Sequence, residues 1–261
     1  MPGRRLILMS DSGFSALEFL AALLRQEITC VTRLRLDAAL YRPALPRHPG
    51  TIGRPRTKGW RLPTLAAVLT NEPTRWQRLT VPGWYGEGDR VVEICSDTAV
   101  WCHAGLPVVP IRWVLLRDPC RRFDPQALLY TDLAQEPLQI IRWFVQRWQL
   151  EVTFREVRDH LGVETQRQWS DKAIARTTPC LLGLFSVATL LASRLDSRTR
   201  TQVSASAWHH KQRPTFADSL AAVRREIWSE QGFVVSRQSV DAAKLPPALR
   251  EGIAYALCHA A

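Results

Sequence analysis

The segment from Arg4 to Leu36 alternates between the patterns of a strand, a helix and a strand, and this order constrains the fold more than any other feature. Arg4 to Ser10 contains a continuous apolar run that ends in a turn, as expected for a fully buried strand. Ser12 to Gln26 has the apolar spacing of an amphipathic helix, and Ile28 to Leu36 is rich in β-branched residues. We therefore predict a βαβ unit within an α/β fold. Asp11 then lies at the carboxyl end of the first strand, where open α/β sheets commonly place their chemistry.

The middle of the chain has a different composition. Arg42 to Arg61 is dense in Pro, Gly and Arg, which predicts a mobile basic loop without regular structure. Short strands separated by turn residues are expected after it, and they define a β-rich insertion at about residues 42–120. The expected strands are Thr64 to Thr70, Trp76 to Val81, Arg90 to Cys95 and Ile111 to Arg117.

The remaining elements are expected to be mostly helical. A strand at Gln126 to Thr131 precedes a long helix from Pro137 to Leu161, because proline suits the first position of a helix and no internal Gly or Pro interrupts the segment. Gly162 is a natural helix stop. A largely apolar helix (Asp171 to Arg194), a polar linker (Ser193 to Arg213), an amphipathic helix (Phe216 to Gln231) and a tail follow. We divide the chain into residues 1–194 and a C-terminal linker with a helical tail, residues 195–261.

The charge of the chain favours a polyanionic partner. Its 35 Lys and Arg residues outweigh 24 Asp and Glu residues, for a formal net charge of +11, and most of the cations are arginine. Because a guanidinium group pairs with phosphate through two hydrogen bonds, DNA is the first candidate. Arginine-rich composition can also reflect the base composition of a genome.

The sequence does not support several other classes of protein. The six cysteines form no CxxC pair and no zinc-ligand spacing, so we interpret them as buried thiols of a reducing compartment. The start of the chain lacks the length of a signal peptide. The longest apolar stretch, Cys180 to Ala192, is short for a membrane span and predicts a buried helix. We therefore expect a soluble cytoplasmic protein with no membrane partner.

One helical face combines a carboxylate with three arginines. Arg147, Glu151, Arg155 and Arg158 follow one another at spacings of four, four and three, so they share a face of the predicted helix. Flanking guanidinium groups would keep Glu151 ionised within a phosphate-attracting surface, as a metal-dependent nuclease needs. Such pairs are also common as solvated ion pairs on helix surfaces, and spacing alone leaves both interpretations open.

The same helix carries a family resemblance. Phe144, Arg147, Glu151 and Arg158 stand in an order and spacing that resemble the Tyr-Arg-Glu-Lys signature of one large group of bacterial insertion-sequence DDE transposases. Phe144 replaces the usual Tyr, and Arg158 replaces the usual Lys. Leu8 to Phe14 resembles the strand end that carries the family's second Asp. The β-rich insertion, with its basic stretch, also matches the family's pattern.

The resemblance implies a fold, a cofactor and roles for residues. The fold would be RNase H-like, a mixed sheet flanked by helices with a β-rich insertion before the catalytic Glu helix. Asp11 and Glu151 would be catalytic residues and ligands of a two-Mg²⁺ site that supports in-line displacement at phosphorus. The enzyme would cleave and transfer DNA strands, with transposon ends and target DNA as partners and a homodimer as a further expectation. The basic residues expected to bind DNA are Arg147, Arg155 and Arg158 on the helix and Arg54, Arg56 and Lys58 in the loop.

The family's first Asp has no counterpart before Asp11, which predicts an N-terminally truncated catalytic domain that does not cleave DNA by itself. Asp11 could in principle be the first metal-binding Asp and Asp97 the second, but Asp97-Thr98 is more simply interpreted as a turn. The truncation would also leave an exposed sheet edge. Two other functions stay open: a non-catalytic DNA-binding remnant of a transposase, and a basic α/β protein unconnected with DNA.

Overall fold

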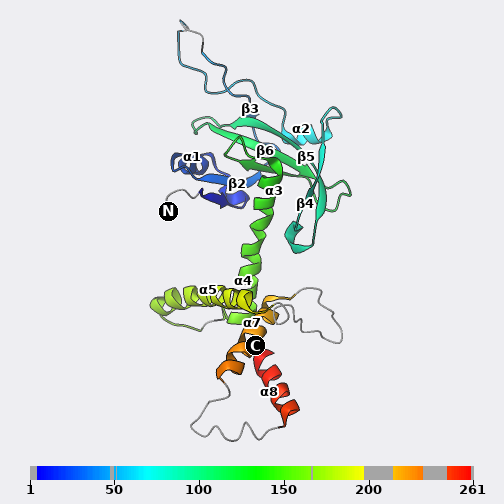
Figure 1. Cartoon of the computed structure of the whole chain (residues 1–261). Coiled ribbons are helices and arrows are strands. Elements are labelled where there is room, and N and C mark those ends of the chain that lie inside the picture. Colours follow the sequence, from blue (N-terminus) through cyan, green and yellow to red (C-terminus); the bar gives the residue numbers. More distant parts are fainter. Residues whose placement is uncertain are drawn as a thin grey trace. The chain divides into compact units, whose positions relative to one another are not determined.

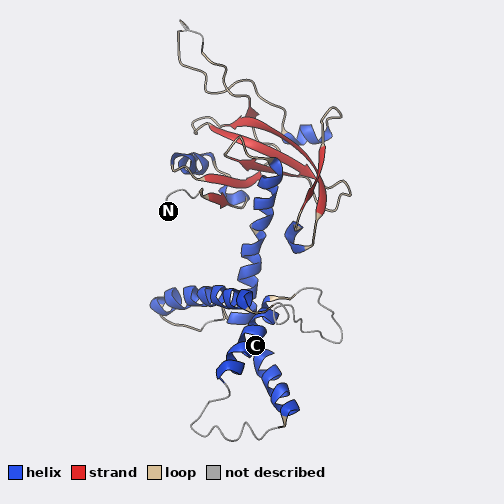
Figure 2. Ribbon diagram, viewed as in Figure 1, coloured by secondary structure: helices blue, strands red, loops and turns tan. Residues whose placement is uncertain are grey.

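The computed structural model describes residues 5–47, 50, 52–165, 167–196, 214–231 and 246–259. The chain forms two compact units, Met1–Leu150 and Glu151–Ala261, which are described separately below. In the described residues every strand belongs to the first unit, whereas the second unit is helical (Figure 2).

The first unit is built on an open, mixed sheet of seven strands in the order β1-β2-β7-β6-β5-β3, with β4 paired to β5 (Figure 1). Its strands are β1 (Ile7–Met9), β2 (Thr29–Leu34), β3 (Leu40–Tyr41), β4 (Gln77–Val81), β5 (Arg90–Trp101), β6 (Val109–Arg117) and β7 (Gln126–Tyr130). Only β1 and β2 pair in parallel, and the other pairs are antiparallel. The prediction of an α/β fold with a mixed sheet flanked by helices is confirmed at this level.

The βαβ unit predicted at the start of the chain is present. β1 leads through a short 3-10 helix, η1 (Ser12–Phe14), into α1 (Leu17–Arg25), and β2 then returns beside β1. The expectation that the first strand is fully buried is wrong. In the described part of the chain β1 pairs with β2 alone and lies at an edge of the sheet, so Leu6 and Met9 remain exposed.

Both faces of the sheet are covered, and the side chains divide between them with the period of two that strands impose. On β7, Leu129 belongs to a cluster formed with α1 and α2 (Leu65–Thr70), whereas Leu128 belongs to a second cluster with α3 (Pro137–Gln146). The sheet is therefore a layer between helices, and its strand ends and edges are left to form polar surfaces.

Two predictions within the insertion are wrong. Thr64 to Thr70 is not a strand, because Thr64 is the N-cap of α2 and its Oγ1 accepts a hydrogen bond from the Ala67 N–H at 3.2 Å. Asp97 and Thr98 do not form a turn, since β5 runs without interruption through both and pairs them with Trp113 and Arg112 of β6. The other insertion strands are confirmed as β4, β5 and β6.

The long helix predicted after β7 is interrupted once. α3 begins at Pro137, as predicted, and a turn at Arg147 separates it from α4 (Trp148–Leu161). Gly162 ends α4 with a φ of 75°, a conformation that glycine adopts without strain. The boundary between the two units lies in the first turn of α4.

The second unit contains most of α4, together with α5 (Asp171–Arg194), α7 (Phe216–Gln231) and α8 (Pro247–His259). The bounds predicted for α5 and α7 are confirmed, and the predicted linker lies mostly outside the described residues. The expectation that α5 is buried is wrong, because its only buried residues are Ala188 and Ala192. By length and composition α5 could cross a membrane, a property that it shares with apolar core helices, and it is the one such helix among the described residues.

The cysteines do not form one buried class as expected. Cys30, Cys102 and Cys258 are buried, but Cys120 and Cys180 are exposed. Burial raises the pKa of the Cys30 thiol, whose sulfur lies 3.6 Å from the Ser10 hydroxyl. All six are free thiols.

Candidate nucleic-acid interface

Asp11 lies at the carboxyl end of β1, where the sequence predicted it. Its Oδ1 accepts a hydrogen bond from the Ser12 N–H at 2.7 Å, which caps η1. Its main-chain oxygen accepts a hydrogen bond from the Thr32 hydroxyl at 2.8 Å, which links the end of β1 to β2. Asp11 is exposed, and no described residue donates a hydrogen bond to its Oδ2. The backbone around this carboxylate is thus fixed while one oxygen faces solvent.

The basic loop between β3 and α2 is closed at its base by backbone hydrogen bonds. Arg42 N–H donates to the Trp60 carbonyl at 3.0 Å, and Gly59 N–H donates to the Arg42 carbonyl at 2.8 Å. A Cβ on Gly59 would lie 2.8 Å from the Pro43 carbonyl oxygen, so this close approach requires glycine. Above this base the loop projects its cations into solvent.

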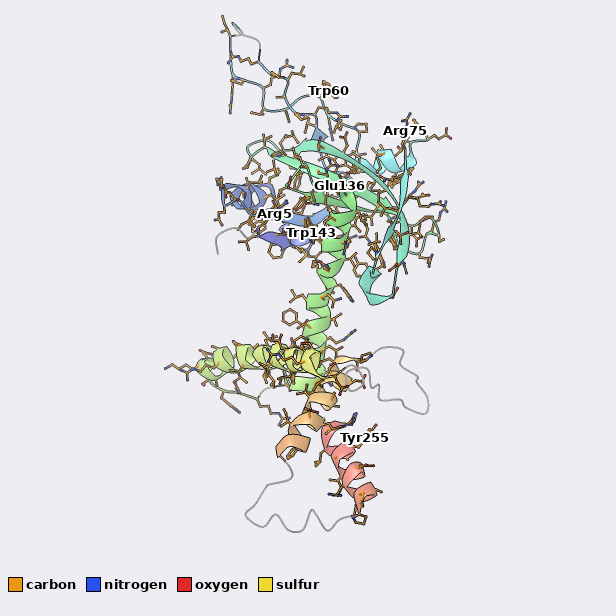
Figure 3. All side chains as sticks on the ribbon, in the orientation of Figure 1. Arg5, Trp60, Arg75, Glu136, Trp143 and Tyr255 are labelled. Atoms are coloured by element: carbon orange, nitrogen blue, oxygen red, sulfur yellow. The ribbon has the colours of Figure 1, made fainter. Side chains whose placement is uncertain are left out.

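Three loop residues predicted to bind DNA lie on this projection. Arg54 and Arg56 are exposed, and Lys58 is half-buried with its Nζ 3.9 Å from the centre of the Tyr41 ring. Hydrogen bonding to the Tyr41 side chain raises the pKa of Lys58, so its charge is firmly held. The exposed Trp60 accompanies them (Figure 3), and all four residues line one cavity of about 570 Å³. The loop therefore combines cations with an accessible aromatic face, as nucleic-acid surfaces do.

Asp97 forms an ion pair with the base of the loop. Its Oδ2 accepts a hydrogen bond from Arg42 Nη1 at 2.9 Å, which ties the loop base to the centre of β5. The turn expected at Asp97 is absent, and the expectation that Asp97 is not catalytic stays a prediction. No local sequence signal links these two residues, which lie 55 positions apart.

On α4, Glu151, Arg155 and Arg158 share a face, as their spacing predicted. All three are exposed. Arg158 has a carboxylate partner that sequence reasoning missed: its Nε and Nη2 bond the two oxygens of Glu164 at 2.7 and 3.0 Å. The hydrogen bonds that Arg158 donates to Glu164 raise the pKa of Arg158. Gly162 could have indicated this pair, because the left-handed turn there folds the following residues back.

The aromatic residues of the predicted helix have separate environments. Phe144 is buried on α3 against the sheet, and the Arg147 guanidinium lies 5.5 Å from its ring centre. Phe154 is 44% exposed and Trp148 is 36% exposed, and the Trp148 ring lies edge-on to Tyr85. These side chains are therefore surface residues.

The candidate catalytic residues belong to different units. Asp11 and Arg147 lie in Met1–Leu150, and Glu151, Arg155 and Arg158 lie in Glu151–Ala261. The convergence of Asp11 and Glu151 on one metal site stays a prediction. Within the described residues no three His, Cys, Asp or Glu side chains are grouped to hold a metal ion.

Comparison of the chain with protein-family models and with curated proteins finds no match.

Proposed function

We propose that this chain acts on DNA as part of a DDE-type transposase, with an RNase H-like arrangement of its sheet. The observation that carries this proposal is the position of Asp11, an exposed carboxylate held by backbone contacts at the carboxyl end of the one parallel strand pair of the described sheet. This end of an α/β sheet is where ligands commonly bind. The motif of Phe144, Arg147, Glu151 and Arg158 supports the same assignment.

The cationic surfaces support DNA as the partner. Arg54, Arg56 and Lys58 are carried by a loop whose base is anchored to the sheet, and the net charge of the chain is +11. Phosphate contacts of this kind provide affinity without base specificity. Transposon ends and target DNA, a homodimer and a cytoplasmic location are parts of the same proposal.

A second candidate is DNA binding without strand cleavage. It requires only the exposed cations of the basic loop and of α4, and no metal-binding group. Under this alternative the basic loop and α4 still hold DNA, while Asp11 and Glu151 have no catalytic role. The two candidate functions use the same DNA-binding surface and differ only in whether the DNA is cleaved.

The binding test measures the affinity of the full chain for duplex DNA across a salt series. We expect log Kd to vary linearly with log salt, and the double variant Arg54→Gln/Arg56→Gln to reduce that slope by about 2, since each phosphate contact contributes about 0.9. Arg25→Gln, an exposed arginine at the end of α1, is the matched control for the loss of positive charge. An absence of binding at moderate salt would overturn both candidates.

The cleavage test incubates the same protein with supercoiled DNA and Mg²⁺. Nicking that is abolished by Asp11→Asn and by Glu151→Gln, and retained by Glu18→Gln, selects the transposase-type enzyme. Glu18 is an exposed carboxylate in the first turn of α1 and controls for loss of negative charge. Salt-dependent binding without nicking selects the non-catalytic candidate.

A further inference from the structure

A pocket of the sheet unit lies near Asp11, at the carboxyl ends of β1 and β2. Its volume is about 820 Å³, within the range of about 300–1,000 Å³ typical of small-molecule sites. Its lining residues come from η1, the end of β2, the loop that follows, and the adjoining ends of β5 and β7. The lining includes Ser12, Arg33, Arg61, Trp101, His103 and Gln126.

The pocket is contiguous with the Asp11 backbone. Ser12 lines it and donates its N–H to Asp11 Oδ1. Thr32, whose hydroxyl donates to the Asp11 carbonyl, precedes Arg33 and Leu34 on β2, and both of these residues line the pocket. Asp11 itself is not among the lining residues, and the pocket adjoins it through Ser12.

The polar lining is cationic. Arg35 is neutralised by Asp37, which bonds its Nε and Nη2 at 2.8 and 2.6 Å. Arg33 and Arg61 are exposed, and neither pairs with a carboxylate in the described part of the chain. His103 adds a third group that can bind an anion. Unpaired guanidinium groups in a concave site favour a phosphate ligand.

A buried donor in the pocket wall supports the same ligand. Trp101 is 8% exposed, and its indole Nε1 finds no hydrogen-bond acceptor among the described residues. A buried donor without an acceptor is costly, and native structures usually supply one. The ring of His103 lies edge-on to Trp101, with 6.3 Å between ring centres. Because Nε1 itself has almost no exposed surface, a phosphate oxygen in the pocket would reach the indole N–H only if the Trp101 side chain moved.

The non-polar and amide groups of the lining indicate more than a bare phosphate. Leu34, Leu36 and Ala127 offer apolar contact, and Gln126 and Ser12 offer hydrogen-bonding groups that both donate and accept. A deoxynucleotide presents an anion, an apolar ring face and a polar ring edge together. We propose that this pocket binds one nucleotide of a DNA strand, with its phosphate on Arg33 and Arg61 and its base against the apolar wall. This inference rests on the proposed function, and it identifies where a DNA strand would contact the protein near Asp11.

The test titrates the full chain with thymidine 5′-monophosphate and, separately, with inorganic phosphate, following binding by calorimetry. We expect Arg33→Gln and Arg61→Gln each to weaken nucleotide binding about tenfold or more, because a hydrogen bond to a charged group is worth about that factor. Arg25→Gln, away from the lining residues, should leave it unchanged. Equal affinity for phosphate and nucleotide would overturn the assignment of a base-binding wall.

A second pair of variants tests the indole. Trp101→Phe should weaken nucleotide binding about tenfold, since it removes the N–H and keeps an aromatic ring. Trp113→Phe is a matched control, because Trp113 Nε1 is also buried without an acceptor while Trp113 is not among the lining residues. An equal effect of both substitutions would contradict a direct contact.

The outcomes separate this inference from the proposed function. Duplex binding without nucleotide binding, or nucleotide binding that ignores Arg33 and Arg61, overturns the pocket and leaves the DNA proposal standing. Nucleotide binding lost in the pocket variants, without any affinity for duplex DNA, supports the pocket and overturns the DNA proposal.

Discussion

The sheet unit and the helical unit use their apolar residues differently. In Met1–Leu150 the sheet buries two clusters, one on each face, and its central strands contribute fully buried leucines and valines. In Glu151–Ala261 the apolar helix α5 leaves large side chains exposed, among them Leu190 at 60%. The contacts of the polar side chains also differ between the units. In the sheet unit, Asp11 and Asp97 are held by residues of other elements. On α4, Arg158 pairs with Glu164, which lies six positions later in the sequence.

This contrast indicates where the stability of the chain resides. Burial of apolar surface contributes about 25 cal/mol for each Å², so a unit with two buried clusters has a large cooperative source of stability. A helix with little buried surface depends on its own capping and on local ion pairs, and it opens at lower free energy. We therefore expect substitutions in the two units to have different consequences even where their local chemistry is the same.

The largest expected effect comes from truncating a leucine in each unit. Leu129 on β7 has no exposed surface, so Leu129→Ala should lower the free energy of unfolding by about 2–5 kcal/mol through lost burial and a cavity. Leu190→Ala on α5 should change it by less than about 0.5 kcal/mol. Urea unfolding followed by near-ultraviolet circular dichroism measures both. Comparable losses would show that α5 is buried in solution.

A smaller effect separates two helix caps of the same kind. Thr64 Oγ1 caps α2 and Ser170 Oγ caps α5. Each oxygen accepts one hydrogen bond, at 3.2 Å, from the backbone N–H of the residue three positions later. Thr64→Ala should lower the unfolding free energy of the sheet unit by about 1 kcal/mol. Ser170→Ala should instead speed amide hydrogen exchange in the first turn of α5 without moving the main unfolding transition. A shift of that transition by both variants would indicate one cooperative unit.

A pH-dependent effect is expected at Glu93 in the sheet. The hydrogen bond from Arg78, at 2.9 Å, and that from Arg117, at 3.0 Å, hold the pKa of this carboxyl below its ordinary value of about 4.3. Because the folded pKa is lowered, the contribution is complete above the ordinary pKa and is lost as pH falls through the folded one. Glu93→Gln should cost about 1 kcal/mol at pH 7, and the difference from the unsubstituted protein should shrink as pH falls from 5 to 3. Arg78→Gln, which removes one partner, should give a smaller cost with the same trend, and a difference independent of pH would contradict this assignment.

The sequence predicted those parts of the fold whose signals are local. The periods of β2, α1 and α7, the helix start at Pro137 and the helix end at Gly162 are carried by neighbouring residues, and the structure confirms them. The apolar and β-branched residues from Thr64 to Thr70 suit a strand as well as a helix, and the capping hydroxyl of Thr64 favours the helix.

The errors at the candidate site have a different physical cause. Asp97 looks like a turn residue in isolation, but its conformation is set by β6 across the sheet and by Arg42 from the loop base. The pocket beside Asp11 likewise joins segments from η1 to β7 that no local pattern connects. Whether Asp11 and Glu151 meet depends on how two units associate, which neither residue's own segment encodes.

The smallest expected effect concerns the ion pair on the helical unit. Arg158 and Glu164 are both about half exposed, so the pair competes with any phosphate for the same guanidinium group. Glu164→Gln should release Arg158 and strengthen duplex DNA binding about two- to fivefold at low salt. Glu251→Gln on α8 removes the same charge from an exposed site and should have less effect, and Arg158→Gln should abolish the gain. If Glu164→Gln and Glu251→Gln strengthen binding equally, the gain reflects net charge and Arg158 has no special role. If only Glu164→Gln strengthens binding, the basic face of α4 contacts DNA through local chemistry. The carboxylate of Asp11 differs in this respect, because its position depends on the whole sheet.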